Sequence, residues 1–522
     1  MNLSNLMEGI DVLEIAGPSD STVMVTSVCY NSRLCTPDSL FVAVRGFKSD
    51  GHDYIDDAVH RGARVIVCEE EVTVSPEITV VRVGNGRRAL GLLAKNFYAA
   101  PSRSLIAVGV IGTNGKTTVT YILESIIQAA GFPCGILGTV NYRYPGLIME
   151  APNTTPESLD LQRILREMVD HGVTHVVAEV SSHAVDLRRI DDCDFDLGIF
   201  TNLTQDHLDY HKTMENYYQA KKRFFAEVLP AGKKQRRYAM AVNADDPWGK
   251  RLIRETGDVS RPLTFGIEQN ADIRASSFDL SLGGIKAEIA VGSVTFEIAS
   301  ALIGKFNLYN VLAAVSAAVA LRIPVEAICQ GVWNMTAVPG RLEKVSGSNQ
   351  PEVFVDYAHT DDALRRVLQS LTPFKQGRII TVFGCGGDRD RGKRPLMGKV
   401  ATNYSDLTIL TSDNPRSEDP LTIIRDIEVG INNQSIPEGS SEDLVRGMTG
   451  RGYVVIPDRR EAIEAAIRSA RPSDIVLIAG KGHEDYQIIG AKRLYFDDRV
   501  VAKEILRNSS ETNCKVKVGK ES

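Results

Sequence analysis

A glycine-rich stretch, GVIGTNGKTT at residues 109–118, has the residue types that bind a polyphosphate. Glycines let successive backbone N–H groups surround phosphate oxygens, and the N-terminus of a following helix adds its dipole. Lys116 would reach the β- and γ-phosphates, and the hydroxyl of Thr117 would ligate Mg²⁺. The stretch departs by one position from G-x-x-x-x-G-K-[ST], because Gly109 lies six residues before Gly115. A chance Gly-rich turn is the alternative, but the expected strand before it and helix after it favour nucleotide binding.

A carboxylate and an imidazole follow two later apolar runs. Glu179 comes directly after the run at 176–178, and His207 lies in TNLTQDHLDYH, after the run at 197–200. Carboxyl ends of parallel strands meet at one edge of a sheet, so both side chains could lie near a γ-phosphate. Mg²⁺ prefers oxygen ligands, and a single His is tolerable beside phosphate oxygens. Spacing alone also fits two ordinary polar residues. Lys221, in a helical stretch, is by itself best explained as a solvated lysine.

Three apolar runs in the last part of the chain each end in a polar or Gly-rich loop: RIITVFGCGGDRD, LTILTSDNPR and IVLIAGKGHED. In open α/β sheets, ligands bind at the carboxyl ends of the strands. The second loop, TSDNPRSEDP at 411–420, has the composition of a surface turn. It nevertheless places Asp413, Asn414 and Arg416 within four residues, directly after a strand-like run.

Three sections of the chain must position these groups. Strand-like runs alternate with helical stretches throughout, which predicts an α/β fold with mostly parallel sheets. Breaks at Pro101-Ser102 and near Pro339-Gly340 divide the chain. We predict three domains, at 1–102, 103–338 and 339–522.

Composition narrows the functional classes. The chain has 522 residues and a net charge of −6, which gives no overall attraction to nucleic acid. Its eight cysteines are scattered and form no Cys-x-x-Cys pair, which fits reduced thiols in a cytoplasmic protein. The N-terminus lacks the pattern of a signal peptide, and no apolar run is long enough to span a membrane.

Nine short motifs in a fixed order resemble the Mur ligases of peptidoglycan synthesis, specifically the members that add the third peptide residue. The motifs are GTNGKTT, NTTP, EVSSHA, TNLTQDHLDYH, PGRLE, DYAHT, GCGGDRDRGKRP, DNPR and AGKGHEDYQ. The family's own phosphate loop is shifted by one position, as here. The resemblance implies a UDP-binding first domain, a P-loop ATPase domain and a Rossmann-like C-terminal domain that binds the amino acid.

The reaction implied by the resemblance is ATP-dependent amide formation. The D-glutamyl carboxylate of UDP-N-acetylmuramoyl-L-alanyl-D-glutamate attacks the γ-phosphate of ATP and becomes an acyl phosphate. The amine of meso-2,6-diaminopimelate then displaces phosphate. Because carboxylate and triphosphate are both anions, Lys116 and Mg²⁺ must screen their repulsion. We expect a cytoplasmic monomer that has no nucleic-acid partner and no membrane span.

The resemblance also assigns catalytic, metal and ATP-binding residues. It implies that Glu179, His207 and Thr117 hold Mg²⁺ and that Lys221 is carbamylated by CO₂, which reverses the interpretation as a solvated lysine. Together with Lys116, the implied catalytic residues are Lys221, Glu179 and His207. The implied ATP-binding residues are Gly112, Thr113, Asn114, Gly115, Lys116, Thr117, Thr118, Asn307, Asn310, Arg341 and Asp356.

The two other substrates have their own implied contacts. The nucleotide-sugar peptide would be bound by Ser32, Phe47, Lys48, Ser49, Asn153, Thr154, Thr155, Ser181 and Arg189. Diaminopimelate would be bound by Arg389, Asp413, Asn414, Pro415, Arg416, Gly480 and Glu484. Two positions depart from the family pattern: Leu187 replaces a frequent Gln, which puts one polar contact in doubt, and Asp361 replaces a usual Pro.

Alternatives remain at this point. Lysine-adding members lack the arginine of DNPR, because lysine has no carboxylate beside its distal amine for a guanidinium fork to receive. Addition of L-lysine in place of diaminopimelate is the first alternative, and the arginine of DNPR argues against it. A ligase like folylpolyglutamate synthase, and a non-catalytic nucleotide-binding regulator on the same scaffold, are the others.

Overall fold

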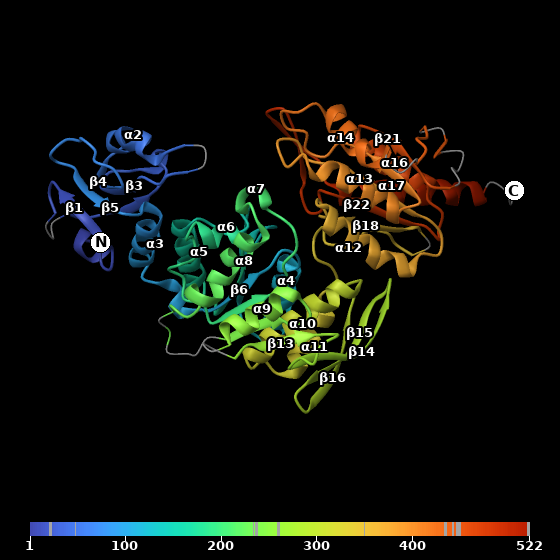
Figure 1. Ribbon diagram of the computed structural model, residues 1–522, viewed down its shortest axis with the longest axis horizontal. Coiled ribbons are helices and arrows are strands. Elements are labelled where there is room, and N and C mark those ends of the chain that lie inside the picture. The colour runs from blue at the N-terminus through green and yellow to red at the C-terminus, as the bar shows by residue number, and fades with distance from the viewer. Residues whose placement is uncertain are drawn as a thin grey trace. The chain divides into compact units, whose positions relative to one another are not determined.

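The computed structural model describes residues 1–19, 23–46, 49–232, 234, 239–257, 261–348, 350–432, 436–440, 443–444 and 450–518. The chain divides into two compact units. Figure 1 shows the helices and strands coloured from the N-terminus to the C-terminus. The first unit comprises Met1–Leu203, His211–Arg274 and Leu312–Gly331. The second comprises Thr204–Tyr210, Ala275–Val311 and Val332–Ser522. The predicted α/β class is confirmed, whereas the domain boundaries at residues 102 and 338 stay predictions.

The first unit begins with a small five-stranded sheet in the order β1-β5-β4-β3-β2. Its strands β2 to β5 are parallel, and β1 runs antiparallel to β5. The strands are β1 Val12–Ala16, β2 Ser27–Cys29, β3 Ser39–Val42, β4 Ala63–Cys68 and β5 Thr79–Val83. The helices are α1 Leu3–Leu6, α2 Ile55–His60 and α3 Gly86–Phe97. Strands and helices therefore alternate in this section, as predicted for the whole chain.

A second sheet of this unit contains the parallel strands β13-β12-β11-β6-β10-β7, followed by antiparallel β8 and β9. Its strands are β6 Ile106–Ile111, β7 Cys134–Leu137, β8 Tyr142–Tyr144, β9 Leu147–Met149, β10 His175–Val180, β11 Leu197–Phe200, β12 Ala239–Asn243 and β13 Leu263–Gly266. The almost uninterrupted apolar sequence of β6 is typical of a parallel strand covered on both faces. Because β6 lies between β10 and β11, the ends of these three strands are neighbours.

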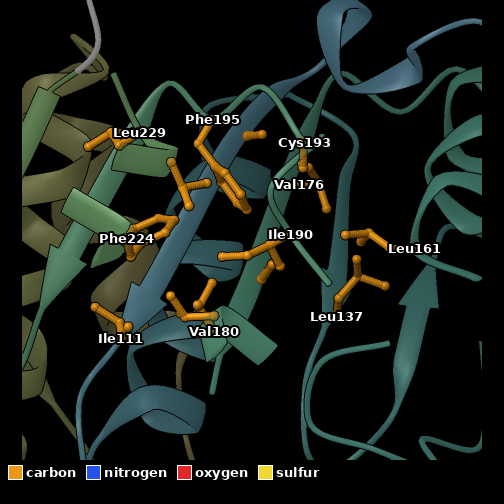
Figure 2. Packing of buried hydrophobic residues seen from close by; sticks show 14 of the residues in the cluster. Ile111, Leu137, Leu161, Val176, Val180, Ile190, Cys193, Phe195, Phe224 and Leu229 are labelled. Carbon is orange, nitrogen blue, oxygen red and sulfur yellow. The ribbon is translucent and has the colours of Figure 1, made fainter. Parts of the chain in front are cut away.

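Helices and a hydrophobic cluster cover this sheet. The helices are α4 Lys116–Ala129, α5 Ser158–Asp170, α6 Ser182–Asp186, α8 Met214–Arg223 and α9 Pro247–Thr256. Figure 2 shows the cluster on one face, where Ile111, Val176 and Val180 of the strands pack near Ile190 and Phe224. Side chains alternate across a strand, so the intervening residue Glu179 lies on the opposite face from Val180. The packing of one face thus determines which way Glu179 points.

The second unit contains a six-stranded sheet in the order β17-β18-β22-β19-β20-β21. All neighbours are parallel except β17 and β18. The strands are β17 Glu343–Lys344, β18 Glu352–Asp356, β19 Ile379–Phe383, β20 Leu407–Leu410, β21 Gly452–Val455 and β22 Ile475–Ala479. The three runs that we predicted to end in ligand loops are therefore the adjacent strands β22, β19 and β20.

Both faces of this sheet are buried. Ile379, Phe383 and Leu477 belong to one hydrophobic cluster, while their neighbours Ile380 and Val476 belong to another. The helices are α12 Asp361–Leu371, α13 Lys393–Tyr404, α14 Pro420–Asn432, α16 Arg459–Ser469 and α17 Asp498–Val518, and Figure 1 shows α12, α13, α14, α16 and α17 around β18 and β22. Side chains of α12, α13 and α14 enter the first cluster, and those of α16 and α17 enter the second. This doubly covered parallel sheet matches the predicted Rossmann-like section.

The remaining elements include a small hairpin, β23 Tyr486–Ile489 and β24 Lys492–Tyr495, and a longer one, β15 Gly284–Val291 and β16 Val294–Ser300. Four elements continue from one unit into the other: β14 Ile273–Ser281, α7 Leu208–His211, α10 Lys305–Ala320 and α11 Val325–Asn334. Asp361, the departure from the family pattern, lies in the first turn of α12, where a carboxylate favours the helix dipole. None of the helices in the described part of the chain has the length and apolar character needed to cross a membrane.

Candidate active site

The predicted phosphate loop connects β6 to α4. Gly112, Thr113, Asn114 and Gly115 separate the two elements, and Gly115 has a left-handed φ of 87°. The ammonium of Lys116 donates to the carbonyl oxygens of Gly112 and Thr113, both at 2.9 Å. Thr117 and Thr118 are buried in the first turn of α4. The strand, loop and helix that a polyphosphate site requires are therefore present.

Two residues at the end of β11 hold this loop. The carbonyl oxygen of Asn202 accepts from the N–H of Thr113, and its Oδ1 accepts from the N–H of Asn114, both at 2.9 Å. The hydroxyl of Thr201 donates to the carbonyl oxygen of Asn114 at 2.7 Å. Any side chain at Gly112 would collide with that hydroxyl. The neighbouring strand therefore fixes the path of the loop backbone.

Lys221 is not a solvated helical lysine. It lies on α8 and is 1% exposed, and its Nζ donates to the carbonyl oxygen of Gly112 at 2.9 Å. Nζ also lies 4.4 Å from the centre of the Tyr217 ring, whose hydroxyl is 3.3 Å from the hydroxyl of Thr113. Helical spacing without tertiary context had suggested solvent exposure, but α8 turns this face toward the phosphate loop.

Glu179, on β10, is 1% exposed. Its Oε1 accepts from the N–H of Thr139 at 2.9 Å, and its Oε2 accepts from the hydroxyl of Thr139 at 3.0 Å. That hydroxyl is 3.1 Å from the hydroxyl of Thr154. The loop after β7 therefore orients the Glu179 carboxylate and links it to the NTTP motif.

The structure brings together Thr155, Ser181 and Arg189. The hydroxyl of Thr155 donates to the carbonyl oxygen of Glu179 at 2.8 Å and accepts from the N–H of Ser181 at 3.1 Å. Arg189 donates to the carbonyl oxygen of Thr155 at 3.1 Å and pairs with Glu157 at 3.2 Å. Three of the predicted sugar-peptide contacts thus form one network, and Leu187 lies close to it as the C-cap of α6.

The other predicted nucleotide-sugar contacts are more dispersed. Asn153 is exposed, and its carbonyl oxygen accepts from the hydroxyl of Tyr142. Ser32 is buried in a short turn after β2, and Ser49 is exposed. Phe47 and Lys48 lie outside the described residues. Their roles, like those of the whole set, stay predictions.

His207 belongs to the second compact unit, whereas Glu179 and Lys221 belong to the first. Its side chain is 45% exposed, lies 3.5 Å from the carboxylate of Asp206, and sits on a residue with a left-handed φ of 53°. Non-glycine residues in this conformation are often found at functional sites. The pairing of His207 with Glu179 around a metal therefore stays a prediction.

Oxygen donors in the first unit fit Mg²⁺. The hydroxyl of Thr117 and the carboxylate of Glu179 are both buried and are the ligand types that this ion prefers. Among the residues that the structure describes, no group of three or more His, Cys, Asp or Glu side chains is arranged to hold a metal. Mg²⁺ usually takes one or two carboxylates and completes its shell with substrate phosphates and water.

Two of the predicted ATP contacts form a buried pair in the second unit. The side-chain amide of Asn310 donates to Oδ1 of Asn307 at 2.9 Å, and the amide of Asn307 donates to the carbonyl oxygen of Ile303 at 2.9 Å. Both asparagines are buried. The pair orders the start of α10.

Asp356 and Arg341 lie together at the end of β18. The Asp356 carboxylate accepts from the N–H of Leu342 at 2.6 Å and from the N–H of Ala358 at 2.7 Å. Burial raises the pKa of the Asp356 carboxyl to about 6, although the charge of Arg341 opposes the shift. The Arg341 guanidinium lies 4.6 Å from the centre of the Tyr357 ring. These contacts link the PGRLE and DYAHT motifs.

The predicted amino-acid pocket contains a polar network between the loops after β20 and β22. The amide of Asn414 donates to Oε2 of Glu484 at 2.8 Å, and its Oδ1 accepts from the N–H of Ile488 at 2.9 Å. Lys481, fully buried, lies 3.3 Å from both side chains. Burial raises the pKa of Glu484, and the charge of Lys481 opposes the shift. A Cβ added at Gly480 would lie 2.8 Å from the Asp413 carboxylate.

Arg416 and Arg389 approach the same glycine. Arg416 donates through Nη1 to the carbonyl oxygen of Gly387 at 2.8 Å. A Cβ added at Gly386 would lie 3.0 Å from Nη1 of Arg416 and 3.7 Å from Cγ of Arg389. Pro415, between Asn414 and Arg416, is buried, whereas Arg389 is exposed. The structure therefore brings the predicted diaminopimelate residues together at three adjacent strand ends.

Sequence reasoning did not identify several residues that orient these groups. They are Thr139 beside Glu179, Thr201 and Asn202 beside the phosphate loop, Tyr217 beneath Lys221, Glu157 beside Arg189, and Lys481 beside Asn414. Thr201 and Asn202 lie in the TNLTQDHLDYH motif, so the sequence did contain a signal for these two residues. The partners lie far apart along the chain, so local patterns could not pair them.

Three family models match the chain. They are described as the Mur ligase family, catalytic domain, at residues 24–98, the Mur ligase middle domain at 110–318, and the Mur ligase, glutamate ligase domain, at 340–482. The chain belongs to the Mur ligase family. The class that we inferred from the order of the motifs is thereby confirmed.

Individual proteins support this assignment. The UDP-N-acetylmuramoyl-L-alanyl-D-glutamate–2,6-diaminopimelate ligase of Geobacter metallireducens is 46% identical over 493 residues, which are 94% of this chain and 96% of that protein. A solved structure with the same protein name is 31% identical, covers 98% of this chain and 99% of its own, and has a TM-score of 0.68. Mycobacterium tuberculosis folylpolyglutamate synthase is 16% identical over 74% of this chain and 90% of its own, with a TM-score of 0.58, and shares only the fold.

Replacing Asn202 with alanine should weaken binding of a nucleoside triphosphate about tenfold. The variant loses the side-chain hydrogen bonds to both backbone groups of Asn114, each worth about 0.5–1.5 kcal/mol. Calorimetric titration with a non-hydrolysable ATP analogue measures the change. Gln219→Ala, which removes an exposed side chain bonded to Glu215, is the control. An unchanged affinity in folded Asn202→Ala would contradict the role assigned to this residue.

The Asp356 carboxyl should make stability fall as pH rises. Its pKa is about 6 in the folded protein and 3.8 ordinarily, so the folded state binds the proton more tightly between these values. The contribution of this carboxyl to the unfolding free energy should therefore decrease by ~3 kcal/mol between about pH 4 and pH 6 and level off above. Urea denaturation of wild type and Asp356→Asn across this range measures the difference. The Asn variant loses one backbone contact at every pH, so a pH-independent gap between the two proteins would refute the prediction.

Proposed function

We propose that this chain is an ATP-dependent ligase that joins meso-2,6-diaminopimelate to the D-glutamyl carboxyl group of UDP-N-acetylmuramoyl-L-alanyl-D-glutamate, a step of peptidoglycan precursor synthesis. The observation that carries the proposal is the cluster of Arg416, Asn414, Asp413 and Glu484 at adjacent strand ends. The 46% identity to the diaminopimelate ligase of Geobacter metallireducens supports it. A cytoplasmic, monomeric enzyme is part of the same proposal.

The chemistry of the amino-acid pocket favours diaminopimelate over lysine. Diaminopimelate carries a carboxylate beside its distal ammonium, and lysine has the ammonium alone. Arg416 and Arg389 supply guanidinium groups for that carboxylate, because a planar fork binds it at two points. Asp413 and Glu484 supply carboxylates for the ammonium. With lysine, Arg416 would lose its anion while half-buried, and such sites can reject the analogue by roughly 10⁴-fold.

Lys116 makes the first chemical step possible. The D-glutamyl carboxylate must approach the γ-phosphate although both are anions. The Lys116 ammonium, held over the phosphate loop, offsets this repulsion and supports in-line attack. The carboxylate oxygen forms a bond to phosphorus, and ADP leaves. The amine of diaminopimelate then attacks the acyl carbon, loses a proton, and inorganic phosphate leaves.

Thr117, Glu179 and His207 are the residues that would hold Mg²⁺. When bound, this ion supplies positive charge beside the β- and γ-phosphates. Thr139 keeps the Glu179 carboxylate directed by two hydrogen bonds. The exposed imidazole of His207 comes from the second unit.

Lys221 is the residue that we assign to carbamylation by CO₂. Its ammonium would first lose a proton, and the neutral amine would then form an N–C bond to CO₂ and release a second proton. A cation would thereby become an anion able to help hold a second Mg²⁺. Its burial beside Gly112 supports this assignment, because a surface lysine would lie far from the phosphates. The anionic form would exchange its hydrogen bond to the Gly112 carbonyl for other donors.

The nucleotide-sugar peptide would extend from the first sheet to the NTTP loop. Arg189, fixed by Thr155 and Glu157, presents a guanidinium group to an anionic substrate. Ser32, Phe47, Lys48 and Ser49 would receive the uridine diphosphate. Leu187 cannot supply a side-chain hydrogen bond to the peptide. Its backbone N–H already donates to the carbonyl oxygen of His183.

Assays of wild type and Arg416→Ala with UDP-N-acetylmuramoyl-L-alanyl-D-glutamate, ATP and either amino acid test the proposal. ADP release should require diaminopimelate, and Arg416→Ala should raise its KM about 100-fold, because a charged hydrogen bond is worth about 1.5–3 kcal/mol. The KM for ATP should change little.

Arg460→Ala removes an exposed guanidinium group that pairs with Glu504, outside both arginine loops, and is the control. Turnover with lysine but not diaminopimelate would refute the substrate assignment. Turnover only with folate as the acceptor would favour the folylpolyglutamate alternative, and absence of turnover with every acceptor would favour the regulator.

Lys221→Ala should lower kcat about 100-fold or more, because a charged group beside the transferring phosphoryl group is lost. Acetate or formate should restore part of the activity by supplying the missing carboxylate. Lys222→Ala, on the same helix but paired with Glu255, is the matched control and should retain activity. Equal activity of the two variants, or no response to carboxylic acids, would contradict carbamylation.

A further inference from the structure

Two loops of the second unit carry the arginines assigned to the distal carboxylate. The loop after β19 contains Arg389, and the loop after β20 contains Arg416. Asp388 and Arg416 both have a left-handed φ of 53°, which non-glycine residues rarely adopt. Backbone contacts fix part of this geometry: Arg416 forms an isolated β-bridge with Ile489, and the N–H of Gly387 donates to the carbonyl oxygen of Asn414 at 2.9 Å. Side chains add a further restraint around Asp388 and Ser417.

Reciprocal hydrogen bonds join the two loops. The N–H of Asp388 donates to Oε1 of Glu418 at 2.6 Å. In return, the hydroxyl and the N–H of Ser417 donate to the Asp388 carboxylate at 2.6 and 3.2 Å. These bonds lower the pKa of Asp388, so the carboxylate stays ionised at neutral pH. Each loop therefore supplies the other with a carboxylate acceptor.

A fully buried arginine anchors this arrangement. The Arg394 side chain is 0% exposed and donates two hydrogen bonds to Glu418, at 2.8 and 3.0 Å. It also donates to Asp426 at 2.8 Å and to the carbonyl oxygen of Gly386 at 3.3 Å. Arg394 lowers the pKa of Glu418 to about 2. One guanidinium group thus ties together both loops and helix α14.

We infer that Asp388, Ser417, Glu418 and Arg394 form a loop clamp that sets the separation of Arg389 and Arg416 and thereby determines affinity for the distal carboxylate of the amino-acid substrate. The inference rests on the proposed function, and the four residues are positioning residues. Nη1 of Arg416 and Cγ of Arg389 both lie close to the position that a Cβ of Gly386 would take. Arg394 holds this glycine by donating to its carbonyl oxygen. Since a displacement of about 1 Å can cost roughly 100-fold, a loosened loop would separate the two guanidinium groups from their shared anion.

Loss of the clamp should change different kinetic constants from loss of a residue that only supports the fold. Support for the fold would lower stability and change all kinetic constants together. Because the clamp restrains only the loops at 384–392 and 411–419, its loss should act on one substrate. Glu418 and Arg394 are poor first targets, since removing either breaks a two-point ion pair with a fully buried guanidinium group, although Arg394 would keep Asp426 and Glu418 would keep Arg391. Asp388 and Ser417 are exposed and can be changed without that penalty.

Asp388→Gly and Ser417→Ala should each raise the KM for diaminopimelate about tenfold while the KM values for ATP and the nucleotide-sugar stay within about twofold. Glycine tolerates the left-handed φ of residue 388 but also frees the backbone, so Ser417→Ala, which removes only a hydroxyl donor, must show the same selective effect. Asp388→Asn should recover most of the affinity, because asparagine also tolerates this conformation and keeps one acceptor oxygen. Hydrogen exchange of both loops should accelerate in Asp388→Gly.

Glu464→Gln, which alters an exposed pair on α16, is the matched control and should leave every constant unchanged. A normal KM for diaminopimelate in folded Asp388→Gly, or equal increases for all three substrates, would overturn the clamp. If wild type accepts lysine and not diaminopimelate, the proposed function fails and the clamp is judged from loop exchange alone. Faster exchange in Asp388→Gly would then support it, and unchanged exchange would refute it.

Discussion

The carbonyl oxygen of Gly112 is the point on which the phosphate site of the first unit depends. It accepts hydrogen bonds from both Lys116 and Lys221, each at 2.9 Å, although the two lysines come from different helices. Two cationic side chains converge there in a chain with a net charge of −6. The glycine is needed because Thr201, which fixes the loop from the neighbouring strand, leaves no room for a side chain. Lys116 thereby supplies a local positive charge for polyphosphate without a basic protein, whereas Lys221 is the lysine assigned to carbamylation.

In the second unit, the carboxyl ends of adjacent parallel strands position the ligand loops. Parallel strands β22, β19 and β20 are adjacent, so their carboxyl ends place three loops side by side. Asn414 bridges two of them by contacts to Glu484 and to the backbone of Ile488, and Arg394 ties the third to helix α14. The sheet supplies the approximate position, and buried polar contacts supply the remaining precision. These two contributions explain how the loop at 411–420, which has the composition of a surface turn, can determine which amino acid is bound.

Local sequence patterns predicted the strands and helices well, but they did not predict the hydrogen-bond partners of the site residues. β6, β10, β11, β19, β20 and β22 were expected from apolar runs, and the phosphate loop from its glycines. Asn202 and Asn114 are separated by 88 positions, and Thr139 and Glu179 by 40, so no local pattern could pair them. Lys221 shows the same limit: its helical surroundings indicated solvent, but the packing of α8 buried it. His207 lies in a different compact unit from Glu179, and their pairing was reached only through resemblance.

The sequence by itself determined the α/β class, the order of the ligand-binding loops and the ligase family. These depend on hydrophobic periodicity and on short contiguous motifs, which the linear chain contains in full. Only the tertiary structure decided which groups are held in place, because burial and hydrogen bonding depend on residues distant along the chain. Arg391 and Arg394 illustrate the difference. They stand three positions apart in one basic run, yet one is exposed and the other is completely buried against Glu418 and Asp426.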